Sequence, residues 1–351
     1  MHTSNFWKNK KVFLTGHTGF KGSWMAIWLS ELGAIVKGYS LDPPSKPSLF
    51  KEANIESLIE SEINDIRDYH QLSKSISKFS PEIIFHMAAQ PLVRASYRNP
   101  IETYETNVMG TVNILQAALK SSNTKAVVNI TTDKCYENRE IDIAYKETDP
   151  MGGFDPYSSS KGCAELVTSA FTKSFYSSKN IGLASVRAGN VIGGGDWAED
   201  RLIPDILRAF ESNKSVIIRN PNSTRPWQHV LEPLSGYLTL AEKLYDSPEE
   251  YSQSWNFGPN YEDVKPVKTI VNFMSSLWPK SSWELDKSDN PHEANLLKLD
   301  ISKAKSKLNW YPKWALDKSL EKIVQWHKLW LSKNINAKNL CIDQIHEYMK
   351  D

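Results

Sequence analysis

The sequence predicts an α/β protein built on a doubly wound parallel sheet, followed by a smaller α+β domain. Up to about residue 190, short runs rich in β-branched residues alternate with longer amphipathic runs, which is typical of βαβ units. After that point the alternation stops and three glycines cluster at 193–195. We therefore expect a first domain over residues 1–190, joined by parts of 230–262, and a second, interleaved domain over 191–351.

The expected strands and helices follow this alternation along the chain. Strands are predicted at residues 11–15, 35–40, 59–63, 83–86, 126–131 and 183–187. Helices are predicted at residues 20–32, 68–78, 101–120 and 157–178. A tail helix is predicted at residues 316–333, where Leu320, Ile323, Trp326, Leu329 and Trp330 recur at helical spacing. Trp197 and Trp227 lie in polar stretches expected to be loops, and they are candidates for stacking on a sugar or a base.

The composition indicates a small-molecule partner. The 351 residues suffice for a large core or two domains. Lys and Arg number 42 against 41 Asp and Glu, and this net charge of +1 gives no strong positive field for nucleic acid or an anionic membrane. No apolar run is long enough to span a bilayer, and the early glycine turn leaves no room for a signal peptide. The three cysteines form no CxxC pair, so we expect no disulfide framework, no metal site and a cytoplasmic location.

A glycine motif follows the first expected strand and opens the first expected helix. It reads GHTGFKG. The first glycine permits a tight turn, the second a close approach to a pyrophosphate, and the third close packing of the helix, whose free N–H groups face the phosphates. A glycine turn can also be purely structural, so its place in a βαβ unit is what favours a Rossmann-type dinucleotide site. The expected cofactor contacts are Gly16, Thr18, Gly19, Phe20, Lys21 and Gly22.

The end of the second strand is expected to hold the adenosine ribose of the cofactor. Asp42 lies 20 residues after Gly22, and its carboxylate would favour NAD over NADP by repelling a ribose phosphate. Ser40 is the alternative occupant of that strand end, in which case Asp42 caps the turn before Pro43. Of the two, Asp42 is preferred.

Residues after the third and fourth strands are expected near the same cofactor. Asp65 and Ile66 follow the third strand, where an adenine can be held; the alternative is a helix start capped by aspartate. Ala88 and Ala89 follow the fourth strand, where small side chains let the backbone come close to a ligand. His86 lies beside them and is expected to be a hydrogen-bonded core histidine rather than a catalytic group.

A tyrosine and a lysine share one face of a predicted helix. Tyr157 and Lys161 are four residues apart, with Asp155 expected to cap the helix and Pro156 to begin it. A nearby ammonium and a positively charged nicotinamide would lower the pKa of the phenol, so that Tyr157 takes a proton from a substrate hydroxyl while hydride leaves for the cofactor. Thr132, at the end of the fifth strand, can align the same hydroxyl. Tyrosine and lysine at this spacing occur by chance on many surface helices, so the argument depends on the motifs that precede them.

These motifs resemble the extended short-chain dehydrogenase/reductase family. The resemblance rests on GHTGFKG at 16–22, HMAAQ at 86–90, Thr132, YSSSK at 157–161 and RAGN at 187–190. It continues into the family's nucleotide-sugar-binding domain with LIP at 202–204, RPWQHV at 225–230 and LDISKA at 299–304. It therefore covers essentially the whole chain. The resemblance implies a tightly held NAD, a nucleotide-sugar substrate, and a homodimer or higher homo-oligomer formed through the helices at 101–120 and 157–178.

The pair that follows Thr132 distinguishes the reactions of this family. Once carbon 4 of a sugar is a ketone, the carbon 5 proton is acidic, and the carbon 6 hydroxyl can leave if an acid protonates it. Asp133 is placed for that role. The family's dehydratases carry Glu as the carbon 5 base where this chain has Lys134, which is either a base of lowered pKa or an ammonium that stabilises the enolate. The Asp-Lys pair with GHTGFKGSW is similar to the family's CDP-glucose 4,6-dehydratases, which implies that CDP-glucose loses water to give CDP-4-keto-6-deoxyglucose.

The resemblance also implies where the substrate diphosphate binds. Asn190 and Arg225 match the family pattern, and Arg201 and Arg208 are further candidates, because a diphosphate rewards bidentate guanidinium contacts. A surface role is the alternative for each arginine. Rival functions are a nucleotide-sugar 4-epimerase, which needs no acid at Asp133, a 4,6-dehydratase of another nucleotide sugar, and a catalytically silent NAD-sensing binding protein. The implied role is deoxysugar biosynthesis for surface polysaccharide such as O-antigen.

Overall fold

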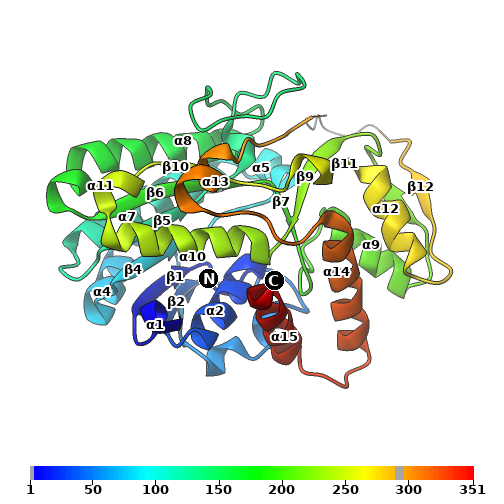
Figure 1. Ribbon diagram of the computed structural model, residues 1–351, viewed down its shortest axis with the longest axis horizontal. Coiled ribbons are helices and arrows are strands. Elements are labelled where there is room, and N and C mark those ends of the chain that lie inside the picture. Colours follow the sequence, from blue (N-terminus) through cyan, green and yellow to red (C-terminus); the bar gives the residue numbers. More distant parts are fainter. Residues whose placement is uncertain (1–3, 289–295) are drawn as a thin grey trace.

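The computed structural model describes residues 4–288 and 296–351. Within them, seven strands form one parallel sheet: β1 (Lys11–Thr15), β2 (Ile35–Ser40), β3 (Glu60–Ile63), β4 (Ile83–His86), β5 (Ala126–Ile130), β6 (Gly182–Ala188) and β10 (Ser254–Phe257). Their order is β10-β6-β5-β4-β1-β2-β3 (Figure 1). The order reverses between β1 and β4, and in such sheets ligands bind outside the carboxyl ends of the strands at that point.

Helices cover both faces of this sheet (Figure 1). Val12 and Leu14 of β1 pack in one core with residues of α2 (Phe20–Glu31), α10 (Leu231–Asp246) and α15 (Ala337–Lys350). Phe13, between them in sequence, packs in a second core with residues of α4 (Tyr69–Phe79) and α7 (Gly110–Lys120). Successive side chains of a strand point to opposite faces, so a strand buried on both sides is apolar throughout. The predicted doubly wound α/β fold is therefore confirmed.

A second group of elements gathers at the right of Figure 1. A three-stranded sheet joins β11 (Val264–Pro266), β9 (Thr224–His229) and β7 (Asn190–Ile192), in that order. A two-stranded sheet pairs β8 (Val216–Ile218) with β12 (Trp283–Leu285). Around them lie α9 (Leu202–Glu211), α12 (Val267–Ser276) and α14 (Leu316–Leu331). Their apolar faces form a third core that includes Ile206, Trp227, Ile270 and Ile323.

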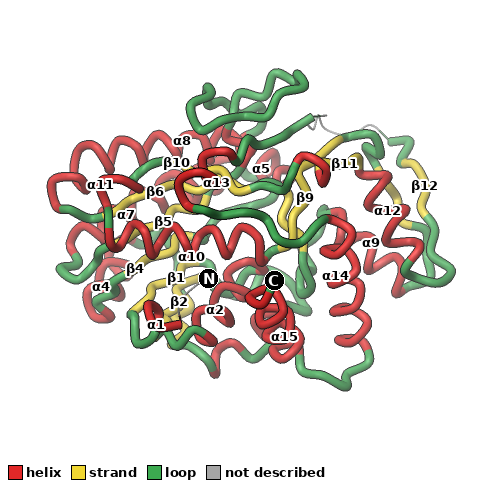
Figure 2. The backbone as a smooth tube through the Cα atoms, in the orientation of Figure 1, coloured by secondary structure: helices red, strands yellow, loops and turns green. Residues whose placement is uncertain are grey.

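Shorter elements connect these groups. They are α1 (Ser4–Trp7), α3 (Leu49–Glu52), η1 (Ile55–Ser57), α5 (Val93–Arg98), α6 (Pro100–Tyr104), η2 (Glu105–Met109), η3 (Asp133–Cys135), η4 (Thr172–Tyr176), η5 (Ser177–Lys179), α11 (Pro248–Tyr251), η6 (Tyr261–Asp263) and α13 (Ser302–Leu308). A further long helix, α8 (Pro156–Phe171), precedes β6. The chain between η3 and α8 runs mostly as a loop, which projects at the top of the view in Figure 2. Among the helices described, none is both long and apolar enough to cross a bilayer.

The predicted elements agree with the structure best in the first half of the chain. β1, β2 and β4 begin and end where predicted, and α14 ends at Leu331 rather than at residue 333. The predicted helix at 101–120 is interrupted, because the π-helical η2 separates α6 from α7. The seventh strand, β10, is missing from the strand prediction and falls within the 230–262 segment assigned to the first domain. The division into two domains stays a prediction.

Candidate active site

The turn after β1 requires glycine at its first and last positions. Gly16 has a φ of +78°, and a Cβ added there would lie 2.7 Å from the amide nitrogen of Ala88. A Cβ added at Gly22 would lie only 2.0 Å from the carbonyl oxygen of Gly16. The first contact brings the loop after β4 against the turn, and the second packs the first turn of α2 against it. Both roles predicted for these glycines agree with the structure.

The N-terminus of α2 is shaped to receive an anion. Its N-cap residue is Gly19, so no side chain covers the first N–H groups of the helix. A Cβ added at Gly19 would lie 3.4 Å from its nearest described neighbour, the carbonyl oxygen of Gly16. Helix N-termini carry unpaired N–H groups and a partial positive charge, so a phosphate can approach this backbone closely. Thr18 fixes the turn beside it, because its hydroxyl donates to the carbonyl of Leu41 at 2.8 Å. The residues present therefore fit the pyrophosphate of a dinucleotide.

The end of β2 carries a serine bonded to this turn. Ser40 is the last residue of β2, and its Oγ lies 2.8 Å from Oγ1 of Thr18. Asp42 is exposed two residues further on. His17 lies beneath the turn with Nε2 2.7 Å from Oγ of Ser61, and burial lowers its pKa to about 4. The choice between Ser40 and Asp42 as the ribose contact stays a prediction.

The residues after β3 are partly committed to local contacts. The Asp65 carboxylate receives hydrogen bonds from the Arg67 side chain, including one of 2.6 Å, and these lower its pKa. Ile66 is 5% exposed and packs against Gly110, where an added Cβ would lie 2.9 Å from it. The alternative interpretation of this stretch is confirmed for Asp68, whose side chain caps α4 by accepting from the amide of Gln71.

The loop after β4 is held to β1 by one threonine. The amides of Met87 and Ala88 both donate to Oγ1 of Thr15, at 3.0 and 3.1 Å. His86 also contacts Thr15, at 2.9 Å through Nδ1, and it contacts Thr111 through Nε2. Burial lowers the pKa of His86 to about 3, so the ring is neutral. The predicted core role of His86 is confirmed, and Ala88 is fixed next to the glycine turn.

The end of β5 leads directly into the predicted acid. Thr132 is the N-cap of η3: its Oγ1 accepts from the amide of Lys134 and donates to Oδ1 of Asp133 at 3.0 Å. Asp133 is 2% exposed, and burial raises the pKa of its carboxyl, against the opposing effects of Lys134, Thr132 and Arg225. In the part of the chain that the structure describes, Oδ2 of Asp133 is buried without a hydrogen-bond partner. The carboxyl therefore holds a proton more readily than an exposed aspartate does.

The predicted tyrosine and lysine lie on the first turns of α8. Asp155 caps this helix by accepting from the amide of Ser158 at 2.9 Å, and Pro156 is its first residue, as predicted. Burial raises the pKa of Tyr157 to about 12 and lowers that of Lys161 to about 8. The Lys161 ammonium donates to the carbonyl of Ile130 at 3.1 Å. Because its pKa is raised, the phenol of Tyr157 stays protonated at neutral pH unless a cofactor brings further positive charge.

One cleft collects most of the predicted catalytic and substrate residues. Its volume is about 310 Å³, and it lies between the carboxyl ends of the sheet and the second group of elements. Its lining includes Lys21, Thr132, Asp133, Lys134, Tyr157, Asn190, Arg201 and Arg225. Burial, then the positive charges of Lys161 and Arg201, lower the pKa of Lys21 to about 7. The cleft is therefore rich in cations, and among its described lining residues two acids are buried: Asp196, which is paired with Arg201, and Asp133.

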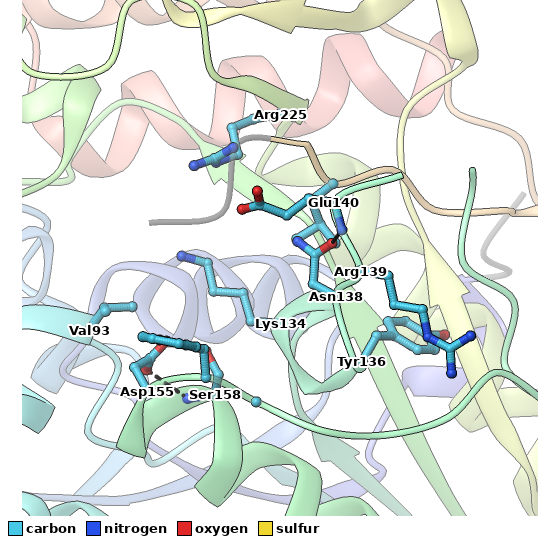
Figure 3. A pocket seen from close by; sticks show the side chains of 12 residues that line it. Val93, Lys134, Tyr136, Asn138, Arg139, Glu140, Asp155, Ser158 and Arg225 are labelled. Atoms are coloured by element: carbon cyan, nitrogen blue, oxygen red, sulfur yellow. Dashed lines mark hydrogen bonds between the residues drawn. The ribbon is translucent and has the colours of Figure 1, made fainter. Parts of the chain in front are cut away.

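A second cavity of about 320 Å³ adjoins the cleft and shares Val93, Lys134 and Arg225 with it. Figure 3 shows the ends of Lys134, Glu140 and Arg225 turned into the same space, while Arg139 points away. Lys134 thus lies at the partition between the two cavities, next to the buried acid.

The sequence of this chain is similar to that of known proteins over most of its length. Residues 13–323 match the family model described as GDP-mannose 4,6 dehydratase. The chain belongs to this family. The CDP-glucose 4,6-dehydratase of Salmonella typhimurium is 61% identical over 337 residues, which cover 94% of this chain and 94% of that relative.

Solved structures share the fold of this family member. The UDP-glucose 4-epimerase of Thermotoga maritima, solved with UDP-glucose, has a TM-score of 0.79 at 21% identity, covering 92% of this chain and 99% of that chain. The dTDP-glucose 4,6-dehydratase of Bacillus anthracis, solved with NAD, has a TM-score of 0.74 at 21% identity, covering 93% and 97%. At this identity the likeness concerns the fold alone, and it agrees with the Rossmann-type arrangement.

The predicted substrate arginines of this family member differ in their surroundings. Arg225 is 6% exposed on β9 and lines both cavities. Arg201 lines the cleft and is paired with Asp196 at 3.0 Å. The guanidinium of Arg208 is bonded to the carbonyls of Trp197 and Ala198 and to Asp205, and it is absent from the described lining of the cleft.

The two tryptophans proposed for ligand stacking are core residues instead. Trp197 is 9% exposed and packs against Trp326 and Trp330, with ring centroids 5.9 and 4.9 Å away. Trp227 is 3% exposed on β9, and its Nε1 donates to the carbonyl of Lys265. The stacking prediction is wrong for Trp197. Trp227 lines the cleft, but its ring is almost completely buried in the wall.

Sequence reasoning missed an arginine pair at the mouth of the cleft. Arg94 and Arg219 both line the cleft, and their Nη1 atoms lie 3.2 and 3.6 Å from Oδ1 of Asp200. Arg219 directly follows β8, so its place at a strand end was the signal available in the sequence. Arg94 lies in α5, far from it in sequence, and nothing in the sequence pairs the two.

Proposed function

We propose that this chain is a CDP-glucose 4,6-dehydratase that uses NAD. The observation that carries the proposal is the buried Asp133 beside Lys134 and Tyr157 in one cleft, in a chain 61% identical to a relative of that name. NAD, when bound, supplies the acceptor for a hydride and its return. The glycine turn, the N-terminus of α2 and Lys161 are the groups that would hold it.

Tyr157 is the proposed base for the first step. It takes the proton from the carbon 4 hydroxyl of the sugar, and Thr132 orients that hydroxyl. Because burial holds the pKa of Tyr157 at about 12, positive charge must lower it for the step to run at neutral pH. Arg201 already acts in that direction, and a nicotinamide ring carries further positive charge.

Asp133 is the proposed acid for the loss of water. Hydroxide is a poor leaving group, so the carbon 6 oxygen needs a proton as its bond to carbon breaks. The raised pKa of Asp133 keeps that proton available, and Oδ2, which has no partner among the described residues, is the oxygen that would carry it. A 4-epimerase has no step that needs such an acid, which is why the site favours dehydration.

Lys134 has two candidate roles, which two substitutions separate. Lys134→Arg keeps a cation that can stabilise the enolate but cannot serve as a base, because a guanidinium does not lose its proton in proteins. Lys134→Met removes both functions. Turnover that survives in the arginine variant and is lost in the methionine variant assigns electrostatic stabilisation; loss in both assigns the carbon 5 base.

Arg201, Arg225 and Asn190 are the proposed contacts of the substrate diphosphate, and Arg219 joins them. Each lines the cleft and supplies hydrogen-bond donors. Arg208 is a less suitable contact, because its donors are already used.

We further propose a homodimer formed through α6, η2 and α8. Ile101, Met109 and Leu166 are 73%, 51% and 61% exposed on these helices. These helices pack against one another, and exposed apolar side chains on adjoining helices are typical of a protein interface. Sedimentation of the wild type and of Ile101→Lys/Leu166→Lys tests the assignment, since the charges should release monomers. The cytoplasmic location stays a prediction.

The experiment that tests the function is incubation with NAD and, separately, CDP-, dTDP-, UDP- and GDP-hexoses, followed by mass spectrometry. Loss of one water confined to CDP-glucose is the expected result. An isomer of unchanged mass would show that the chain is an epimerase. Loss of water from another nucleotide sugar would show that the proposed specificity for the cytosine nucleotide is wrong. Silence across the panel would contradict the proposal and favour the NAD-binding alternative.

A further inference from the structure

A buried ion pair lies directly beneath the catalytic loop. Nη2 of Arg187 donates to Oε2 of Glu165 at 2.7 Å, and the two side chains are 0% and 1% exposed. Glu165 lies on α8, one helical turn after Lys161, and Arg187 lies on β6. Such pairs contribute little net stability, because desolvation offsets most of their attraction. The pair therefore calls for another explanation than stability.

Two further contacts of the pair reach the two ends of the catalytic loop, and Arg187 also donates to the carbonyl of Glu147 at 3.2 Å. Oε1 of Glu165 accepts from the hydroxyl of Thr131 at 2.5 Å. Nη1 of Arg187 donates to the hydroxyl of Tyr136 at 2.8 Å, and the guanidinium lies 4.8 Å from the centre of that ring. Thr131 and Tyr136 flank the stretch that contains Thr132, Asp133 and Lys134.

We infer that Glu165 and Arg187 are positioning residues that hold the loop 131–136 at both ends and so fix Thr132 and Asp133 relative to Tyr157. This inference rests on the proposed function. Tyr157 is fixed by α8, which also carries Glu165, so one rigid helix sets both the base and the acid-bearing loop. A shift of about 1 Å in such groups can cost about a hundredfold in rate.

A third contact of Glu165 provides a matched control. The hydroxyl of Ser185 donates to Oε2 of Glu165 at 2.6 Å, and Ser185 is 3% exposed, like Thr131 at 4%. Thr131→Val and Ser185→Ala thus each remove one buried hydroxyl from the same carboxylate, but only the first lies on the loop. Thr131→Ser keeps the hydroxyl and serves as the rescue. Tyr136→Phe removes the hydroxyl that Arg187 contacts at the other end of the loop, together with its bond to Asn256 at 2.7 Å, and leaves the ion pair intact.

The test compares kcat and KM of these variants with CDP-glucose. Thr131→Val and Tyr136→Phe should each lower kcat about tenfold or more with KM within about twofold, whereas Thr131→Ser and Ser185→Ala should stay within about twofold in both. Equal losses in Thr131→Val and Ser185→Ala would overturn the inference, because the pair would then be only structural.

A second readout does not depend on activity. Amide hydrogen exchange over residues 131–136 should be faster in Thr131→Val and in Tyr136→Phe than in the wild type, and unchanged in Ser185→Ala. Unchanged exchange in the first two variants would overturn the positioning role. If the wild type fails to turn over CDP-glucose, the proposed function is wrong, and the exchange measurement still decides whether the pair holds the loop.

Discussion

The hydroxyl of Thr132 donates a 3.0 Å hydrogen bond to Oδ1 of Asp133, and the other carboxyl oxygen is buried without a partner among the residues described. The bond occupies one oxygen and fixes the plane of the carboxyl. Because burial raises the pKa of Asp133, the free oxygen is the one expected to carry a proton. One hydrogen bond therefore holds the acid, Asp133, against Thr132, the residue proposed to orient the substrate.

The variant Asp133→Asn should separate oxidation from loss of water. The amide keeps the size of the side chain and an acceptor for Thr132, but it cannot donate the proton that the leaving hydroxyl needs. We expect dehydration to fall about a hundredfold to ten-thousandfold. Oxidation at carbon 4 should continue, so reduced cofactor should accumulate and can be followed by its absorbance. Full dehydration in this variant would show that another group is the acid.

Two alanine substitutions in the glycine turn should have different consequences. At Gly22 a Cβ would lie 2.0 Å from the carbonyl oxygen of Gly16, so Gly22→Ala should lower the free energy of unfolding by about 1–3 kcal/mol. A Cβ added at Gly19 would lie 3.4 Å from its nearest neighbour, so Gly19→Ala should change the free energy of unfolding by no more than about 0.5 kcal/mol. NAD affinity should nevertheless fall about tenfold or more in Gly19→Ala, because the methyl group occupies the approach of the pyrophosphate.

Urea unfolding and titration calorimetry on the two variants check this pair. Equal stability losses would show that the turn tolerates neither methyl group. Unchanged NAD affinity in Gly19→Ala would place the pyrophosphate elsewhere.

The arginines predicted for the diphosphate should differ in their effect on KM. Arg225 faces both cavities, and a hydrogen bond to a charged group contributes about 1.5–3 kcal/mol, so Arg225→Ala should raise KM about tenfold or more. The guanidinium of Arg208 is committed to Asp205 and to two carbonyls, so Arg208→Ala should leave KM within about twofold. Steady-state kinetics with CDP-glucose decide between them, and an equal rise in both variants would mean that the cleft rearranges on binding.

Glu232 should make the stability of the protein depend on pH. It accepts from the amide of Trp314 and the hydroxyl of Tyr348, both at 2.7 Å, and burial raises its pKa from 4.5 to about 7. Between these two values the folded state binds more protons than the unfolded state, so the stability contribution is complete below pH 4.5 and is lost as pH rises through 7. The loss is at most about 3 kcal/mol.

Urea unfolding of the wild type and Glu232→Gln between about pH 4 and about pH 8 measures this contribution, because the difference between them cancels the other titrating groups. The wild type should lose stability relative to the variant as pH rises. A difference that is constant, or that grows in favour of the wild type, would show that the hydrogen bonds from the amides of Lys313 and Trp314 and the hydroxyl of Tyr348 hold the carboxylate charged.

The first half of the fold was predictable because periodicity is a local property. The strands β1, β2 and β4 are short, mainly β-branched and aromatic runs between turns, and burial on both faces favours apolar residues in their middle positions. The strand β10 was missed because its four residues, Ser254–Phe257, follow a helical stretch and return to the first sheet only through tertiary packing. The π-helical η2 was missed because the hydrophobic periodicity of residues 101–120 is the same as that of a continuous α-helix.

The catalytic residues were visible because they occupy strand ends and helix starts, whereas their supporting contacts were not. Arg187 is a charge inside an apolar strand, which signals a buried partner without naming it. Its partner Glu165 reads as an ordinary helical charge, and only the fold shows that the two meet at 2.7 Å. The stacking prediction for Trp197 failed for the converse reason, since its polar neighbours in sequence are not its neighbours in space.

The most direct test of the account uses CDP-glucose that carries deuterium on carbon 4. A 4,6-dehydratase with an internal hydride return should give a product lighter by one water, with the deuterium now on carbon 6, as read by mass spectrometry and NMR. A product of unchanged mass, or one that lacks the deuterium, would contradict the proposed reaction.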